Sequence, residues 1–333
     1  MASVYGTAPY NVVQLGKETT PGTAVAATTI WRGPFGSPED TRIRKIKEED
    51  VGYLVPAELS YDTRLGATLA MPASELTFEQ LPHILEAAIL TATPGAGPGY
   101  SRAYAFPTTT SRTIKTYTLE AGNVLVATDQ AEFPYSFVSE FELSGKVEEA
   151  WMMAATWQAQ RWVNSSLTGA LSIPSVEPAL FGYTKLYVND SGGTIGTTQV
   201  GGKLLEATIK VMTGIQYVPA GDGNLYPTAH KFIKPEITFT MAYELEEDTG
   251  VSFVAAERAK WAAKAGRLIR LHTPGSGATK DVKLDLFAIY DKFGAYENSD
   301  GNTSVKVEGH CGYSSTDALF FTATVLNGLA TLP

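Results

Sequence analysis

The side chains best suited to chemistry are few and scattered. The histidines fall at unrelated places, with His83 in an expected helix, His230 in a loop, His272 at a strand end and His310 in a strand. None belongs to an H-E-x-x-H motif or has another spacing that suits a metal ion, so we expect four lone surface or interface residues. The single Cys311 cannot form an internal disulfide, and we expect a small strand residue instead of a reactive thiol.

Two glycine-rich segments resemble phosphate-binding loops only superficially. Residues 275–280, GSGATK, lack the spacing of G-x-x-x-x-G-K-[ST], and residues 192–202, GGTIGTTQVGG, indicate a flexible hairpin or linker. The sequence has no G-x-S-x-G motif, and its adjacent carboxylates, Glu148–Glu149 and Glu246–Glu247, would diverge instead of flanking a scissile bond. The sequence therefore predicts a structural or binding protein with no catalytic, cofactor-binding or metal-binding residues.

Length and charge further limit the classes of protein that fit the sequence. A chain of 333 residues, 44% hydrophobic and 18% charged, predicts two folded domains of ordinary size. With 35 acidic against 26 basic side chains the net charge is -9, which disfavours electrostatic capture of nucleic acid or anionic membrane. The N-terminal residues do not resemble a secretory signal and no long apolar run occurs, so we expect no membrane anchor and synthesis in a reducing cytoplasm.

Residues 52–90 contain the segment around which the expected fold is organised. Apolar and polar side chains alternate up to Leu65, which indicates a half-buried antiparallel strand with one wet face. One face carries Val55, Ala57, Leu59, Tyr61, Thr63 and Leu65, and the other carries Glu58, Ser60, Asp62 and Arg64. The period then changes to three and four from Phe78 to Ile89, which predicts a helix that begins near Glu79 with Thr77 or a near neighbour as its cap. Pro82 fits only in its first turn.

The same arrangement returns about 170 residues later. Residues 203–215 and 234–248 alternate again, and a helix opened by Ser252 and closed by Gly266 is expected after them. We interpret the chain as two copies of one unit, a β-sandwich with a flanking helix, while a chance similarity between two β domains stays open. The expected division is an N-terminal arm with the first strand region at 1–50, a first domain at 51–163, a linker at 164–182 and a second domain at 183–333.

Two segments outside the expected sandwiches suggest contacts with other molecules. The arm at 1–50 has little of its own to bury, so it is either loose or ordered by a neighbour. The Pro- and Gly-rich loop at 91–112 is long enough and aromatic enough to be a docking surface. The contact candidates in these segments are Trp31, Tyr100, Tyr104 and Phe106.

Charged side chains recur on the wet faces of the expected strands. The basic run RIRKIK at 42–47 could be a nucleic-acid patch, but its three following carboxylates favour a solvated strand or a charge match between subunits. The carboxylates that fall on the wet strand faces are Glu58, Asp62, Glu140, Glu142, Glu206, Glu236 and Glu244.

Several segments together resemble the major tail tube proteins of long non-contractile-tailed (siphovirus-like) bacteriophages. The resemblance rests on LGKETTPGTAVAATT at 15–29, EQLPHILEAAIL at 79–90, the hairpin FVSEFELSGKVEEAWMMAATWQ at 137–158 and DALFFTATVLNG at 317–328. It spans nearly the whole chain through short motifs. It implies a mainly β (α+β) fold, in which tail-tube-like sandwiches with flanking helices join into an inner β-barrel on oligomerisation.

The resemblance also implies a function and partners. Subunits would form stacked rings that make a hollow, acidic-lined conduit for genome ejection in the phage tail, with the seven wet-face carboxylates facing the lumen and the aromatic candidates between rings. Viral DNA would pass without specific binding, and tape measure, terminator and tail-tip proteins would be partners. Most family members carry one such domain and form hexamers. Two domains in one chain favour a homotrimer, with a hexamer as the other possibility.

Two other functional classes stay open. A tail-tip, baseplate or fibre component could bind a host-surface glycan or another tail protein through the aromatic loops without forming a tube. An enzyme such as a glycan hydrolase is a more distant alternative. If the arm only orders between rings, deletion of residues 1–30 is expected to leave soluble protein that cannot polymerise.

Overall fold

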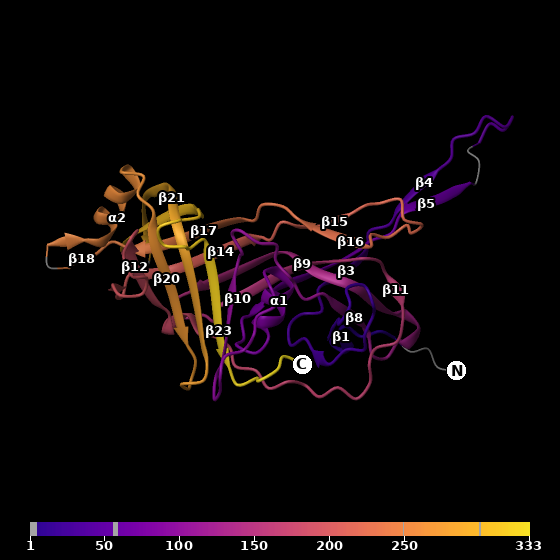
Figure 1. Cartoon of the computed structure of the whole chain (residues 1–333), viewed down its shortest axis with the longest axis horizontal. Helices are drawn as coiled ribbons and strands as arrows, with labels where there is room; N and C mark the ends of the chain where they lie inside the picture. The colour runs from indigo at the N-terminus through magenta and orange to yellow at the C-terminus, as the bar shows by residue number, and fades with distance from the viewer. Residues whose placement is uncertain (1–4, 56–58, 249, 300) are drawn as a thin grey trace.

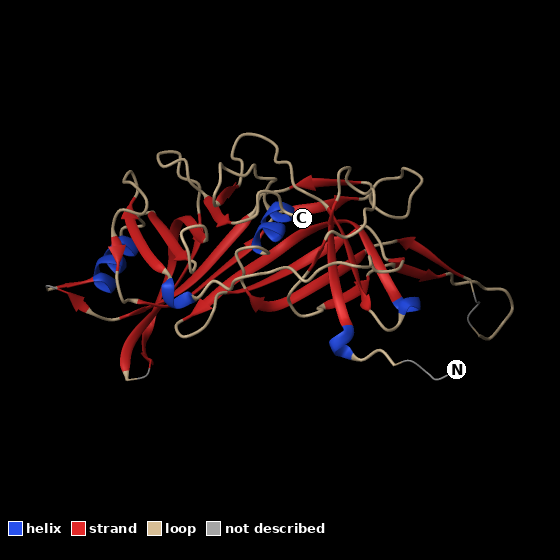
Figure 2. Ribbon diagram, turned by 90° about the horizontal axis from the view of Figure 1, so that it is seen from below, coloured by secondary structure: helices blue, strands red, loops and turns tan. Residues whose placement is uncertain are grey.

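The structure is a computed structural model that describes residues 5–55, 59–248, 250–299 and 301–333, and it shows a mainly β chain (Figure 1). The first half contains β1 (Asn11–Lys17), β2 (Thr29–Ile30), β3 (Ser37–Asp40), β4 (Ile43–Ile46), β5 (Ser60–Arg64), β6 (Ala67–Glu75), α1 (Leu81–Ala88), β7 (Tyr100–Ala105), β8 (Tyr117–Asn123), β9 (Gln130–Lys146), β10 (Met152–Ala159) and β11 (Val163–Asn164). The second half contains β12 (Lys185–Asp190), β13 (Gln199–Val200), β14 (Leu204–Met212), β15 (Ile215–Val218), β16 (Ala229–Phe232), β17 (Glu236–Glu244), β18 (Glu247–Asp248), β19 (Val251–Ser252), α2 (Phe253–Ala262), β20 (Arg267–Pro274), β21 (Asp281–Ser299), β22 (Asn302–Cys311) and β23 (Phe321–Asn327). Figure 2 shows how strands dominate both halves, and no helix among the described residues is long and apolar enough to cross a lipid bilayer.

The two halves repeat one scheme of antiparallel strand pairing. In the first half the pairs are β1–β2, β1–β8, β8–β9, β9–β10, β10–β6, β6–β3, β9–β11 and the hairpin β4–β5. In the second half the pairs, in the same order, are β12–β13, β12–β20, β20–β21, β21–β22, β22–β17, β17–β14, β21–β23 and the hairpin β15–β16. Apart from β7 in the first half and the β18–β19 hairpin in the second, each half has the same strand connectivity, with a helix at the same place in the order.

One long strand in each half belongs to two sheets. The first part of β9 pairs with β8 and its second part pairs with β10, and β21 divides in the same way between β20 and β22. The pairing register shifts by one residue at Ser139 in β9 and at Asp291 in β21. A bulge of this kind bends a strand, which lets one strand pass from one layer of a sandwich to the other.

Two further pairings connect the halves. The second part of β9 pairs with β14, which gives one continuous sheet in the order β3–β6–β10–β9–β14–β17–β22–β21. β7 pairs with β23, so the expected docking loop at 91–112 is partly a strand within the molecule. One hydrophobic core runs through both halves, because apolar side chains alternate along these strands and face inward.

The two helices differ in burial. Every residue of α1 is buried, and the helix contacts β9, β7 and β23. On α2 only Val254 and Glu257 are buried. The expected start of α2 is confirmed, since Ser252 caps the helix by accepting a hydrogen bond from the Ala255 amide. α1 begins at Leu81, two residues after the expected start, and its N-cap Gln80 makes no side-chain capping bond, although Thr77 accepts a hydrogen bond from the Gln80 amide at 3.3 Å.

The expected end of α2 was wrong. The helix stops at Ala262, four residues before Gly266. Gly266 serves packing instead, because a Cβ atom there would lie 2.2 Å from the Phe287 ring. A glycine after an apolar periodic run is therefore a weaker stop signal here than the sequence suggested.

The expected N-terminal arm is also corrected. β1 lies between β2 and β8, with the side chains of Val13 and Leu15 in the core. Deletion of residues 1–30 is therefore expected to unfold the first half instead of leaving soluble protein, because it removes a central strand. Short apolar runs in a polar segment had hidden this strand from the sequence analysis.

Candidate self-assembly interface

The pairing of β9 with β14 is an internal seam between the two halves. Seven residue pairs join these strands, from Glu206 opposite Lys146 to Met212 opposite Glu140. Beyond the last pair, the Thr213 amide donates to the Ser139 carbonyl at 3.0 Å. The seam also carries an ion pair, with 3.7 Å between Lys210 Nζ and Glu140 Oε2.

The continuous sheet ends in two strands whose outer edges lie open. At one end β3 pairs with β6, and at the other end the second part of β21 pairs with β22, while no other described strand pairs with either edge. Most side chains from Asp291 to Asn298 are exposed, whereas β9 at the same place in its own half is largely covered by β14. Open backbone donors and acceptors of this kind are a template for pairing with another strand.

The two open edges are the counterparts of the two strands that form the internal seam. β3 has the place of β14, and β21 has the place of β9. The bulges match Asp291 with Ser139 and Lys292 with Glu140. On the other edge, the registers match Glu39 with Lys210, because Glu39 lies opposite Thr68 and Lys210 lies opposite the equivalent Thr238.

The charges at these matched positions have opposite signs. The internal seam places Lys210 of β14 near Glu140 of β9. The open edges carry Glu39 on β3 and Lys292 on β21 instead. Three residues beyond Glu39, Arg42 matches Thr213, whose amide bonds to Ser139, so Arg42 would face Asp291. In the single chain Arg42 pairs with Asp40 and Asp62. The two open edges are therefore complementary in charge as well as in hydrogen-bonding pattern.

A second contact between the halves comes from the β15–β16 hairpin, which reaches from the second half along the first (Figure 1). Ile215 forms a small buried cluster with Ile114 and Phe137, and the rings of Tyr217 and Phe137 lie 4.6 Å apart. The Arg112 guanidinium lies 4.6 Å from the Phe232 ring centre, and burial lowers the pKa of Arg112 to about 10.

The corresponding hairpin of the first half, β4–β5, projects past the molecule into solvent (Figure 1). The basic run at 42–47 lies in and beside it, where Arg44 and Asp62 form an ion pair at 2.7 Å. Ile43, Ile46, Leu59 and Tyr61 are exposed. Residues 56–58 of the strand predicted at 52–65 lie outside the described residues, and β5 covers only Ser60–Arg64. The predicted half-burial is wrong for β5 in the single chain, because its side chains are mostly exposed and the loop after β15 borders only the base of the hairpin.

Five of the predicted lumen-facing carboxylates lie together. Glu140, Glu142, Glu206, Glu236 and Glu244 alternate with buried residues on β9, β14 and β17, so they share one solvent-facing side of the continuous sheet. This side also carries lysines, and Lys306 pairs with Glu206 at 3.0 Å, so the face is mixed in charge instead of uniformly acidic. Asp62 lies apart on the β5 hairpin strand, and Glu58 lies outside the described residues.

Three of the four aromatic contact candidates are corrected. Tyr104 is fully buried, and Trp31 and Phe106 are nearly so, because they pack in the core of the chain itself. Trp31 and Tyr104 are therefore enclosed in the single chain, while Phe106 also lines an open cavity. Tyr100 is half-buried at the start of β7 and keeps that possibility.

Residues suited to chemistry do not converge. His83 is buried, not on the surface as expected, and its Nδ1 lies 3.1 Å from the Tyr117 hydroxyl. Burial lowers the pKa of His83 to about 3. Cys311 is a buried residue at the end of β22, and burial raises the pKa of its thiol. Within the described ranges, no group of three or more His, Cys, Asp or Glu side chains could hold a metal ion.

Sequence reasoning missed the residues of the open edges. Glu39 and Lys292 belong to short or polar segments with no motif. The signal that could identify them is a position-by-position alignment of the two units. No protein-family model and no curated protein sequence matches this chain.

Proposed function

We propose that this chain is a structural subunit that closes into rings, which stack into a hollow tube like that of the major tail tube proteins it resembles. The observation that carries the proposal is the internal seam between β9 and β14, together with its two unpaired counterparts on β3 and β21. Each chain forms this strand pairing once internally, and it exposes one strand of an equivalent pairing at each end of its continuous sheet.

Pairing β3 of one chain with β21 of the next extends the continuous sheet from chain to chain. Each chain contributes two equivalent sets of four strands, namely β3–β6–β10–β9 and β14–β17–β22–β21. If both seams turn by the same angle, a closed ring of three chains has six equivalent sets, and a barrel leaves no open edge. This supports the trimer over a hexamer of chains.

The proposed lining is the solvent-facing side that carries Glu140, Glu142, Glu206, Glu236 and Glu244. Lysines such as Lys210 and Lys306 lie among these carboxylates and pair with them. A lining of paired charges offers a nucleic acid phosphate little net attraction, so DNA could move along it without being held. The virion, and the phage tail in particular, is the corresponding proposed location.

Electron microscopy and native mass spectrometry of the purified protein test this proposal. We expect rings or hollow filaments, and a ring mass of about 107 kDa for three chains of 35.7 kDa. A protein that stays monomeric at all concentrations, or that binds glycans without forming rings, would favour the tail-tip or fibre alternative.

A further inference from the structure

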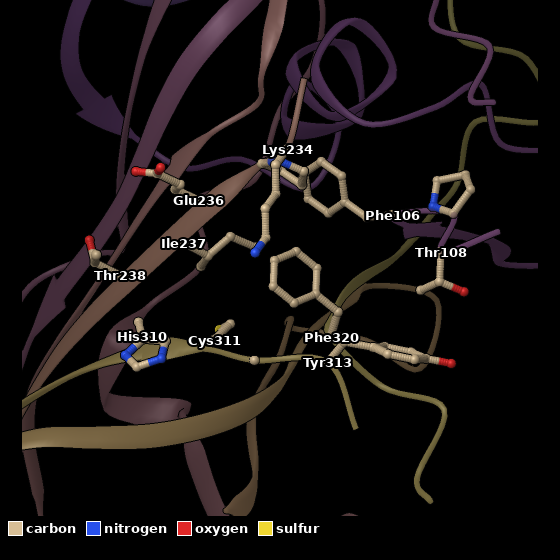
Figure 3. A pocket seen from close by; sticks show the side chains of 13 residues that line it. Phe106, Thr108, Lys234, Glu236, Ile237, Thr238, His310, Cys311, Tyr313 and Phe320 are labelled. Carbon is tan, nitrogen blue, oxygen red and sulfur yellow. The ribbon is translucent and has the colours of Figure 1, made fainter. Parts of the chain in front are cut away.

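The structure contains an open cavity that the internal seam does not use. Its volume is about 610 Å³, and it lies at the ends of β17 and β22 in the second half. Figure 3 shows Phe106, Phe320 and Tyr313 on one side of it, with Ile237, Cys311 and His310 on the other. The lining is largely apolar and open, which is uncommon on a surface that stays in water.

The matched place in the first half is occupied by the molecule itself. There, a smaller cavity of about 220 Å³ remains beside Tyr217, which the β15–β16 hairpin brings from the second half. The lining positions correspond one by one through the strand registers. Gly66, Ala67, Thr68, Gln158 and Ala159 around Tyr217 match Glu236, Ile237, Thr238, His310 and Cys311 around the open cavity.

The residue of the β4–β5 hairpin at the position of Tyr217 can be identified from both of its strands. Ile46 follows Glu39 by the same seven residues by which Tyr217 follows Lys210. On the partner strands, Ile46 lies opposite Ser60 and Tyr217 lies opposite His230, and both of these precede the matched Thr68 and Thr238 by eight residues. The match therefore needs no insertion or deletion on either strand.

We infer that the open cavity of the second half receives the β4–β5 hairpin of a neighbouring copy of this chain, with the Ile46 side chain inside it. The repeat identifies this occupant, because β15–β16, the counterpart of β4–β5, already fills the matched place in the first half. An Ile46 side chain that is 66% exposed and an empty apolar cavity are then explained by one contact. The inference rests on the proposed ring and specifies its second interface.

A cross-linking experiment tests the contact in the full chain. Cys311 is first replaced by Ala, and Ile46→Cys is combined with Tyr313→Cys, because Tyr313 lines the cavity and is 51% exposed. With a short bismaleimide cross-linker we expect covalent dimers and trimers on a denaturing gel. The matched control combines Tyr313→Cys with Ile173→Cys, an isoleucine that is 71% exposed elsewhere, and should give at least tenfold less cross-linked product.

A second pair of variants does not depend on the cross-linking chemistry. We expect Ile46→Asp to lower the fraction of protein in rings at least tenfold, while Ile173→Asp leaves this fraction unchanged. Rings that form normally with Ile46→Asp, or cross-links no more frequent than in the control, would overturn the inference and leave the proposed ring standing. A wild-type chain that forms no rings would overturn the proposed function itself.

Discussion

The two hairpins of this chain have the same place in the strand order and opposite surroundings. β15–β16 packs on the other half, where Ile215 and its neighbours are buried, whereas β4–β5 lies bare with Ile46 exposed. The helices differ in the same direction, since α1 is fully buried under β7 and β23 and α2 is mostly exposed. The two halves therefore share a topology but differ in burial. The surfaces of the first half are covered within the chain, whereas the matching surfaces of the second half stay exposed.

The largest expected effect comes from removing each hairpin in turn. Replacement of residues 215–232 by a short Gly-Ser linker uncovers Phe137 and Ile114, and we expect a loss of about 3–5 kcal/mol in the free energy of unfolding. Replacement of residues 43–64 in the same way should change this free energy by less than about 0.5 kcal/mol, because those side chains are exposed.

Urea unfolding of both variants measures the difference, and native mass spectrometry shows whether the second variant still forms rings. We expect the second variant to be folded and monomeric. If both deletions destabilise the chain equally, the two hairpins do not differ as the comparison states.

A pH experiment sharpens the comparison of the helices, because α1 carries a buried histidine. The folded pKa of His83 is about 3 and an unfolded histidine has a pKa of about 6.5, so the unfolded state takes up a proton first as the pH falls. The contribution of neutral, buried His83 to the free energy of unfolding is therefore complete above about pH 6.5. It is lost as the pH falls from 6.5 to 3, at about 1.4 kcal/mol per pH unit.

Urea unfolding at pH 7 and pH 5 measures this contribution. We expect the decrease in unfolding free energy between these pH values to be about 2 kcal/mol smaller in His83→Gln than in the wild type. Ile84→Val on the same helix is the matched control, which should lower stability at both pH values by the same amount. An unchanged pH dependence in His83→Gln would mean that α1 is less enclosed than the structure shows.

The smallest expected effect concerns the ion pair of the proposed outer seam. Lys292→Glu or Glu39→Lys alone should weaken ring formation about fivefold per seam, since partly exposed ion pairs contribute up to about 1 kcal/mol and reversal adds repulsion. The double variant should restore assembly to within about twofold. Sedimentation measures the ring fraction, with Lys185→Glu on the surface of β12 as the control. A double variant as weak as either single variant would show that the register is wrong.

The mainly β class and the capped start of α2 could be predicted from the sequence, and the start of α1 to within two residues, because alternation and capping are local signals. The placement of Val13 and Leu15 could not, since β1 is short and its burial comes from β8, about 100 residues away. Tyr104 and Phe106 were assigned to a docking loop because the Pro and Gly around them hid a strand that pairs with β23.

The alternation at 52–65 led to a different kind of wrong prediction. It predicted a half-buried strand, and the hairpin indeed has apolar residues such as Leu59 and Tyr61, but they are exposed in the single chain. In the candidate interface, the shared side of Glu140, Glu142 and Glu206 could be predicted because each lies in an alternating run. The charge match of Glu39 with Lys292 could not, because it requires the registers of two separate halves.

Opposite charge order at the inner and outer joints has a consequence for how copies sort themselves. A stray β3 edge that tried to displace β14 from β9 would bring Glu39 against Glu140, two carboxylates where the chain's own Lys210 fits. In the proposed assembly, this repulsion disfavours exchange of halves between chains and favours end-to-end joining. In the proposed ring of three chains, covalent linkage makes every second seam internal. Assembly then needs two bimolecular associations and one closure, where six separate units would need five associations and one closure. Each avoided association saves a cost on the order of 4–15 kcal/mol.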